Sequence, residues 1–295
     1  MSSLLILISV LAFTCNGFGT RLFQTRLAHA ERRLPLYQAL FCGISMVCFW
    51  GYGKFALPSL ETCLYGVIFG ILFFLASYMG AKCYMLGSMA LTSVIMNMSL
   101  IVPLLYSIFF LKESITLLHV IGFCFFCASV ICSAVTKDQQ KKGNLLWLLL
   151  VMVGFCSNGM TATIQKVYAI EAASKQDSVF LGVAYLTAAL CFLVTFLLQR
   201  AKRKDEVLTP IRSAYVWKFI GIAVLAGVGS FGGNLLLGQL APKVDAAILY
   251  PCINGGLAIC TSLISFFFFK EKPTAQKVIS ILLGCAAIVV LNLGT

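Results

Sequence analysis

The amino-acid sequence predicts an all-α, polytopic membrane protein with ten transmembrane helices in two inverted five-helix repeats. Hydrophobic residues make up 60% of the 295 residues and charged residues only 11%, a composition outside the soluble globular range. Apolar runs of about 20 residues recur along the chain, and about 20 helical residues cross the hydrocarbon core of a bilayer. Features of the first half also recur, in the same order, in the second half.

The first repeat is predicted over residues 1–136 and contains five apolar segments. The first run is interpreted as a membrane helix, because no Lys or Arg precedes it and no small-residue cleavage site follows it. Charged residues or Pro/Gly pairs interrupt the chain between the later runs. The five segments are 2–21, 35–56, 59–80, 85–111 and 115–136.

The second repeat is predicted over residues 143–295. Its five segments are 143–167, 178–199, 214–238, 244–269 and 274–293. Because each repeat has an odd number of crossings, the second copy enters the membrane from the opposite side. Inverted repeats of this kind are typical of secondary transporters, which bind substrate near the bilayer midplane.

Two local motifs carry the duplication. An Asn-Gly pair lies in the first segment of each half, at Asn16-Gly17 and Asn158-Gly159. A Lys-Glu corner followed by Thr lies between the fourth and fifth segments, at 112–116 and 270–274. The shared order of both motifs predicts two collinear copies.

Charge predicts orientation and surroundings. Most of the 22 Lys and Arg residues lie in the odd-numbered loops, and basic short loops stay cytoplasmic, so both termini are predicted outside. The basic run at 200–204 is interpreted as a contact for anionic lipid headgroups rather than for nucleic acid. The predicted location is the cell membrane, plasma or inner, as a multi-pass protein.

With these motifs, the chain resembles the drug/metabolite transporter superfamily in its EamA-like branch, over its whole length. The resemblance implies a secondary carrier whose central cavity is lined by the first, third, fourth, sixth, eighth and ninth helices. Relatives carry varied metabolites, so the resemblance does not name the cargo. It also implies cytoplasmic termini, in disagreement with the distribution of charge.

Polar side chains within apolar runs are the candidate cavity-lining residues, since burying them in hydrocarbon is costly unless they pair or serve function. Each has an alternative structural interpretation, such as an interhelical hydrogen bond, or a lysine reaching the headgroups. Lys166, like the candidate Lys82, could line the cavity or reach the headgroups. The candidates are Asn16, Asn158, Tyr78, Asn97, Asn234, Tyr250, Asn254, Gln239 and Lys82.

Hinges are predicted at Pro103, Pro251, Gly255 and Gly256, because proline removes a helical hydrogen bond and bends the helix. Segment 244–269, which contains the last three, is the favoured broken or hinged helix. At the corners, Glu113 and Glu271 are interpreted as structural carboxylates that favour free amide groups at the start of the following helix.

All ten acidic residues lie in loops or at helix ends, which disfavours efflux of lipophilic cations through a buried carboxylate. The leading hypothesis is an exporter of small polar metabolites such as amino acids, working by alternating access. A nucleotide-sugar or sugar-phosphate antiporter and a non-transporting assembly subunit are the alternatives. No enzymatic nucleophile, cofactor or metal ligand set is predicted. The predicted partners are a small-molecule substrate, lipid, and a second copy in a homodimer.

Overall fold

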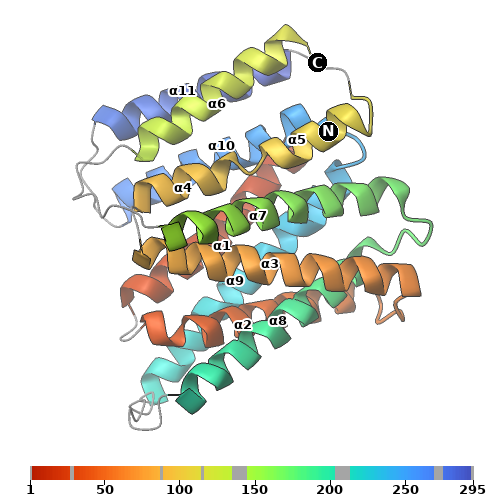
Figure 1. The fold of residues 1–295 in the computed structure, drawn as a ribbon, viewed down its shortest axis with the longest axis vertical. Coiled ribbons are helices and arrows are strands. Elements are labelled where there is room, and N and C mark those ends of the chain that lie inside the picture. Colours follow the sequence, from red (N-terminus) through yellow and green to blue (C-terminus); the bar gives the residue numbers. More distant parts are fainter. Residues whose placement is uncertain are drawn as a thin grey trace. The chain divides into compact units, whose positions relative to one another are not determined.

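The computed structural model describes residues 2–26, 30–86, 89–113, 116–134, 145–202, 213–268 and 275–293. These residues form eleven α-helices and no strand (Figure 1). The helices are α1 (Ser2–Arg26), α2 (Ala30–Tyr52), α3 (Leu60–Leu86), α4 (Met89–Met98), α5 (Ile101–Phe109), α6 (Leu117–Ala134), α7 (Leu145–Glu171), α8 (Asp177–Lys202), α9 (Ser213–Leu240), α10 (Ala246–Phe267) and α11 (Ala275–Leu293).

Seven of these helices are long and apolar enough to cross a membrane, and the other four, α4, α5, α6 and α11, form three shorter apolar stretches, Val94–Phe109, Leu117–Cys132 and Val278–Leu291. Large apolar side chains such as Leu4, Leu11 and Phe109 are exposed, as expected for surfaces that face lipid rather than water. Helices predominate because hydrocarbon offers the backbone no hydrogen-bond partner outside its own segment. The prediction of an all-helical fold is confirmed for the described residues, and the seven long apolar helices are consistent with a multi-pass membrane protein, whereas ten crossings and inverted repeats stay predictions.

The helices group into two compact units. Unit 1 comprises Met1–Val10, Leu75–Glu171 and Leu236–Thr295, and unit 2 comprises Leu11–Phe74 and Ala172–Leu235. Each unit therefore draws helices from both predicted repeats. The repeat boundaries at 1–136 and 143–295 stay a sequence-based prediction.

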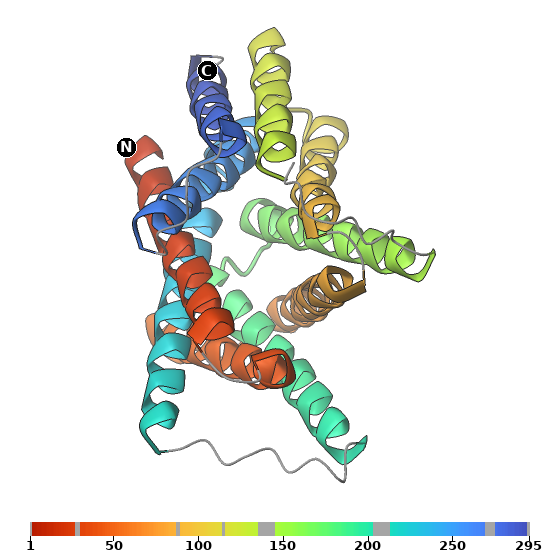
Figure 2. The ribbon, with the colours of Figure 1, turned by 90° about the vertical axis from the view of Figure 1, so that its left-hand side faces the viewer.

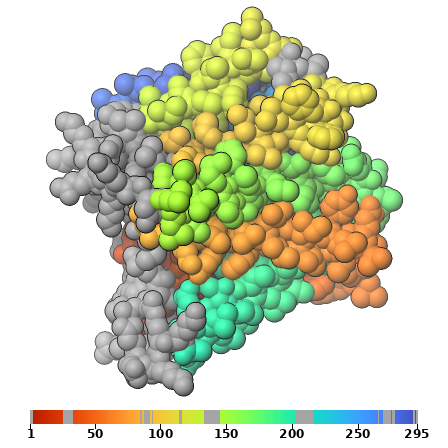
Figure 3. Space-filling model, viewed as in Figure 1, coloured from red at the N-terminus to blue at the C-terminus, as the bar shows by residue number. Residues whose placement is uncertain are grey.

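In unit 1, α6 lies along α11 (Figure 1 and Figure 2). Ser129 Oγ donates to the carbonyl of Ser280 over 2.7 Å, and Ser280 Oγ donates back to the carbonyl of Ser129 over 2.8 Å. At Gly122, an added Cβ would lie 2.5 Å from Leu291 Cγ. Small and hydroxyl residues thus bring the two backbones close, as in other membrane helix pairs. On the face seen in Figure 3, α4 and α5 lie against α7.

In unit 2, α2 lies along α8. Ser45 Oγ on α2 donates to the carbonyl of Gly227 on α9 over 2.9 Å. Gly70 on α3 approaches α8 so closely that an added Cβ would lie 2.4 Å from the carbonyl oxygen of Ala184. Glycine and serine thus allow close backbone contact between helices in this unit as well.

The predicted hinge segments differ from expectation. Segment 85–111 forms two helices, α4 and α5, that are interrupted at residues 99–100. Segment 244–269, which was favoured as the broken helix, is continuous through Pro251, Gly255 and Gly256 as α10. The break thus lies beside Pro103, and the prediction of a break in the later segment was wrong, whereas a hinge there stays a prediction.

Candidate functional site

The interruption between α4 and α5 is shaped by Pro103. Proline has no N–H to offer the carbonyl four residues before it, which here is that of Ser99. The N–H of Val102 instead donates to that carbonyl over 3.0 Å, and the N–H of Ser99 donates to Met96 over 3.3 Å. These tighter, three-residue hydrogen bonds turn the chain and end the regular helix.

Asn158 on α7 contacts this interruption directly. Its Nδ2 donates to Ser99 Oγ over 2.7 Å and to the Met96 carbonyl over 3.4 Å. Ser99 Oγ also donates to the Met96 carbonyl over 2.7 Å. The next residue, Gly159, brings α7 so close that an added Cβ would lie 2.5 Å from Val102 Cβ. A side-chain amide of α7 thus pairs with the polar groups of the interruption.

The exposure of Asn158 is unusual for its position on α7. Residues spaced by three and four share one face of a helix, and Val151, Gly154, Thr161 and Gln165 on the same face are all buried. Asn158 lies in the middle of this buried stripe but is itself exposed. Its amide therefore borders open space on the protein-facing side of α7.

The lipid-facing side of α7 carries different residues. Leu149, Met152, Cys156 and Met160 recur at helical spacing and are all exposed. They form an apolar stripe opposite Asn158 on the helix. Asn158 therefore lies on the face of α7 opposite the lipid-facing stripe, and contact with lipid does not account for its exposure.

Asn16, the counterpart of Asn158 in the first repeat, is half-buried in unit 2. Its Nδ2 donates to the carbonyl of Ala226 on α9 over 2.9 Å. Close to this bond, an added Cβ at Gly229 would lie 2.7 Å from the backbone nitrogen of Asn16. Both asparagines make interhelical hydrogen bonds. Asn16 joins two continuous helices, whereas Asn158 joins α7 to the interruption between α4 and α5.

A buried ion pair lies elsewhere in unit 1. Lys166 on α7 pairs with Glu113 Oε1, and the two side chains are 2% and 15% exposed. Glu113 Oε2 accepts a 2.8 Å hydrogen bond from the N–H of Ala246, the first residue of α10. Asp245, in the N-cap position of α10, makes no capping hydrogen bond through its side chain. Glu113 therefore caps a helix distant in sequence.

This arrangement corrects one part of the corner prediction. Glu113 was expected to favour amide groups at the start of the next helix, α6, but its carboxylate binds the start of α10. Lys112 has a positive φ of 55°, and the N–H of Glu113 returns to the carbonyl of Ser107 over 3.2 Å. The turn thereby directs the carboxylate toward α7 and α10. Glu271 lies outside the described residues.

Two of the candidate cavity-lining residues lie on α10, and they hydrogen-bond to α7 and to α10 itself. Tyr250 is buried, and its hydroxyl donates to the carbonyl of Ala162 over 2.9 Å. Asn254 is half-buried, and its Nδ2 donates to the carbonyl of Tyr250 over 3.0 Å. Both side chains therefore have the structural partners that sequence offered as the alternative to cavity lining.

Asn234 belongs to a buried cluster in unit 2. Its Nδ2 donates to the Tyr185 hydroxyl and to the Ser230 carbonyl, both over 3.0 Å. The Tyr185 hydroxyl also bonds Ser230 Oγ. Neither Tyr185 nor Ser230 was singled out from sequence, although a tyrosine in the middle of an apolar run is the kind of residue that selected the others.

The remaining candidates are dispersed. Lys82 is exposed and lies over the ring of Tyr78, with Nζ 4.5 Å from the ring centroid, a favourable cation–π distance. Asn97 on α4 and Gln239 on α9 are half-buried. Among the described residues, no group of three or more His, Cys, Asp or Glu side chains is placed to hold a metal ion.

Comparison with known proteins identifies a fold and no family. No family model matches the chain, and no curated protein matches it. The chain is similar to a solved structure described only as "Crystal structure of protein", with a TM-score of 0.75 over 99% of this chain and 96% of the other. At 14% sequence identity, this likeness shows a shared fold alone.

Proposed function

We propose that the protein is a secondary active transporter that exports small polar metabolites, such as amino acids, by alternating access. The observation that carries the proposal is the exposed amide of Asn158 within the buried face of α7, next to the interrupted α4 and α5. Non-helical backbone at membrane depth is tolerated where it is buried in protein or lines a water-filled cavity. Broken helices of this kind form substrate sites in transporters.

The pairing of helices supports the proposed inverted repeats. In the predicted duplication, α2 and α8 are the second helices of the two halves, and α6 and α11 are the fifth. Each of these helices packs along its own counterpart. A two-fold axis relating the halves brings matching elements together in this way, because an isologous contact joins each surface to its own equivalent.

The two lysines that are candidates for the cavity, Lys82 and Lys166, favour a neutral or zwitterionic cargo over a sugar phosphate. A phosphate site needs free cationic or amide donors. Lys166 is already paired with Glu113, and the exposed Lys82 lies over the Tyr78 ring. Nδ2 of Asn158 donates its two hydrogens to Ser99 Oγ and to the Met96 carbonyl, so Oδ1 is the uncharged acceptor that can receive a hydrogen bond from a small polar molecule.

The test is counterflow and uptake in proteoliposomes with a panel of amino acids and other small metabolites. Asn158→Ala is compared with Met160→Ala, a matched change on the lipid-facing stripe of α7. We expect Asn158→Ala to lower transport about tenfold, because one hydrogen bond to cargo contributes about 1 to 1.5 kcal/mol, and Met160→Ala to transport normally. Equal activity of the two variants would refute the site. Failure of wild-type protein to move any solute would favour the assembly-subunit alternative.

A further inference from the structure

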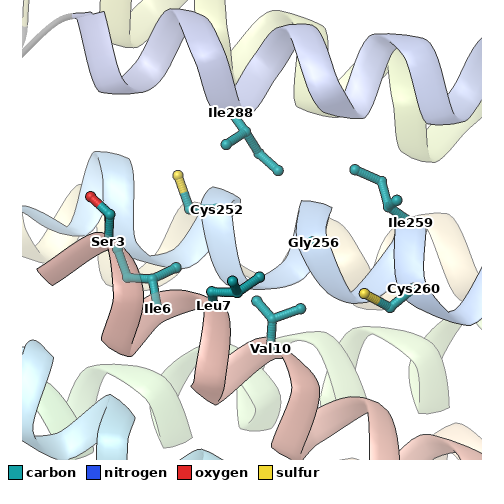
Figure 4. Close-up of a pocket in the computed structure, with 9 residues that line it drawn as sticks. All are labelled: Ser3, Ile6, Leu7, Val10, Cys252, Gly256, Ile259, Cys260 and Ile288. Carbon is teal, nitrogen blue, oxygen red and sulfur yellow. The ribbon is translucent and has the colours of Figure 1, made fainter.

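A second feature of unit 1 is an elongated pocket of about 290 Å³ between the start of α1, the middle of α10 and α11 (Figure 4). It belongs to segments other than the interruption between α4 and α5. The residues that line it are Ser3, Ile6, Leu7, Val10, Cys252, Gly256, Ile259, Cys260 and Ile288.

The lining has the polarity of an acyl-chain site. Its walls are branched aliphatic side chains and the thiols of Cys252 and Cys260, both of which are free. Ser3 lies at one end of the pocket with its hydroxyl directed away from the other lining residues, and Ile259 and Cys260 lie at the opposite end (Figure 4). The pocket is therefore apolar along its whole length.

Its depth depends on Gly256. An added Cβ there would lie 2.9 Å from Val10 Cγ2, so a larger residue would intrude between α1 and α10. On α1 the lining runs from Ser3 to Val10, and on α10 from Cys252 to Cys260. At 1.5 Å per residue, these stretches extend about 10 to 12 Å along the helices.

The surroundings determine what can fill this space. The lining on α1 and α10 falls within two of the apolar spans that are long enough to cross a membrane. Leu7, in the pocket wall, is 53% exposed, so the pocket opens onto surface that faces lipid. Apolar cavities do not hold ordered water, which needs polar partners, and an unfilled void forfeits dispersion contacts.

We propose that the carboxyl-proximal half of a membrane phospholipid's acyl chain occupies this pocket, with its carboxyl end near Ser3 and its middle methylene groups near Ile259 and Cys260. The acyl chain fills the groove between α1, α10 and α11 and leaves its headgroup at the membrane surface by the start of α1. This inference does not depend on transport activity.

The experiment uses the full-length protein in nanodiscs of phosphatidylcholine that carries a diazirine either near the acyl carboxyl or at the middle of the acyl chain. After illumination, labelled peptides are mapped by mass spectrometry. The carboxyl-proximal probe should label residues 3–7 preferentially, and the mid-chain probe should label residues 256–260. We expect each preference to be at least threefold over the exposed surface of α7 around Met152.

A filling variant gives the second test. Ile259→Trp places an indole in the pocket and should lower labelling of residues 256–260 at least threefold. Val289→Trp is the matched control, because Val289 is exposed on α11 next to Ile288 but does not line the pocket. Wild-type labelling that is uniform over all lipid-facing helices would overturn the proposal. So would absence of label from this face, as expected if a second copy of the chain covers it.

Discussion

Segments 85–111 and 244–269 occupy matching places in the two predicted repeats, and each contains a proline. Pro103 accompanies an interruption between α4 and α5, whereas α10 continues through Pro251. The same residue type therefore has opposite consequences in the two places. A proline alone therefore does not predict a break in a helix. Its distance from the helix start and the hydrogen-bond partners on neighbouring helices must also be known.

Position explains the continuity of α10. Pro251 follows Ala246, the first residue of the helix, by five positions, so the carbonyl it leaves free belongs to Ala247 in the first turn. That turn is held by hydrogen bonds from Ile248 and Leu249 to the Asp245 carbonyl and by Glu113 on the Ala246 N–H. The loss of one bond near an anchored end leaves the helix intact.

Partners explain the interruption in the other segment. Pro103 is preceded by a full helix, α4, so its missing N–H falls in the middle of the apolar run. The Ser99 carbonyl that Pro103 leaves free accepts from the N–H of Val102. From α7, Asn158 donates to Ser99 Oγ and to the Met96 carbonyl, and Gly159 allows the close approach that this requires. An interruption that would be costly in lipid is thereby satisfied within protein.

The largest effect should come from removing the anchor of α10. Glu113→Gln leaves the buried Lys166 ammonium without a counter-charge and should lower the free energy of unfolding by about 3 kcal/mol, measured by denaturant titration in mixed micelles. The double variant Glu113→Gln with Lys166→Met removes the unpaired charge and should recover most of this loss. A double variant as unstable as Glu113→Gln alone would show that the ion pair is not the anchor.

The next effect concerns the contact of α7 with the interruption. Gly159→Ala places a Cβ where Val102 and the Ser99 carbonyl already lie, and overpacking of this kind costs about 2 kcal/mol. Gly221→Ala on α9 is the control, because an added Cβ there meets nothing within 4 Å. We expect the control to be neutral or stabilising in the same unfolding assay. Equal stability of the two variants would mean that α7 does not press on the break.

The two prolines can be compared directly. Pro103→Ala restores an N–H that can bond the Ser99 carbonyl, so α4 and α5 can join and displace the contact with Asn158. We expect a severalfold loss of transport with a change in stability within about 1 kcal/mol. Pro251→Ala should alter neither property, because α10 is already continuous. The same loss of transport in both variants would contradict the assigned difference between the segments.

The smallest effect is expected at the other asparagine. Asn16→Ala removes one hydrogen bond to the Ala226 carbonyl, and interhelical hydrogen bonds in membranes average about 0.6 kcal/mol. The variant should keep most of its transport and lose little stability. A loss of transport as large as that of Asn158→Ala would show that the two asparagines share one role.

The fold class could be predicted from composition and the length of apolar runs, because lipid leaves few alternatives to a helix. The break could be predicted only in part. Pro103 and Pro251 look alike in sequence, and what separates them is the start of each helix and the amide of Asn158, which is supplied from a distant segment. The carbonyl that a proline frees lies four residues earlier, and this rule would have selected Ser99.

The site residues show the same limit. The carboxylate of Glu113 was expected at a helix start, and it lies at one, but sequence names only the nearest helix and not the one that packs beside the corner. From sequence, Lys166 could line the cavity or reach the lipid headgroups, and the structure instead pairs it with Glu113. Contacts between distant segments decide such cases, and spacing along the chain does not contain them.

The central claim is that Asn158 borders a water-filled space on the protein-facing side of α7. The most direct test is labelling of Asn158→Cys in a background without other cysteines, using a small, water-soluble thiol reagent. Met160→Cys, which lies on the lipid-facing stripe, is the control. The account predicts rapid labelling at position 158 that excess transported cargo slows, and little labelling at 160. Equal resistance of both positions to the reagent would contradict it.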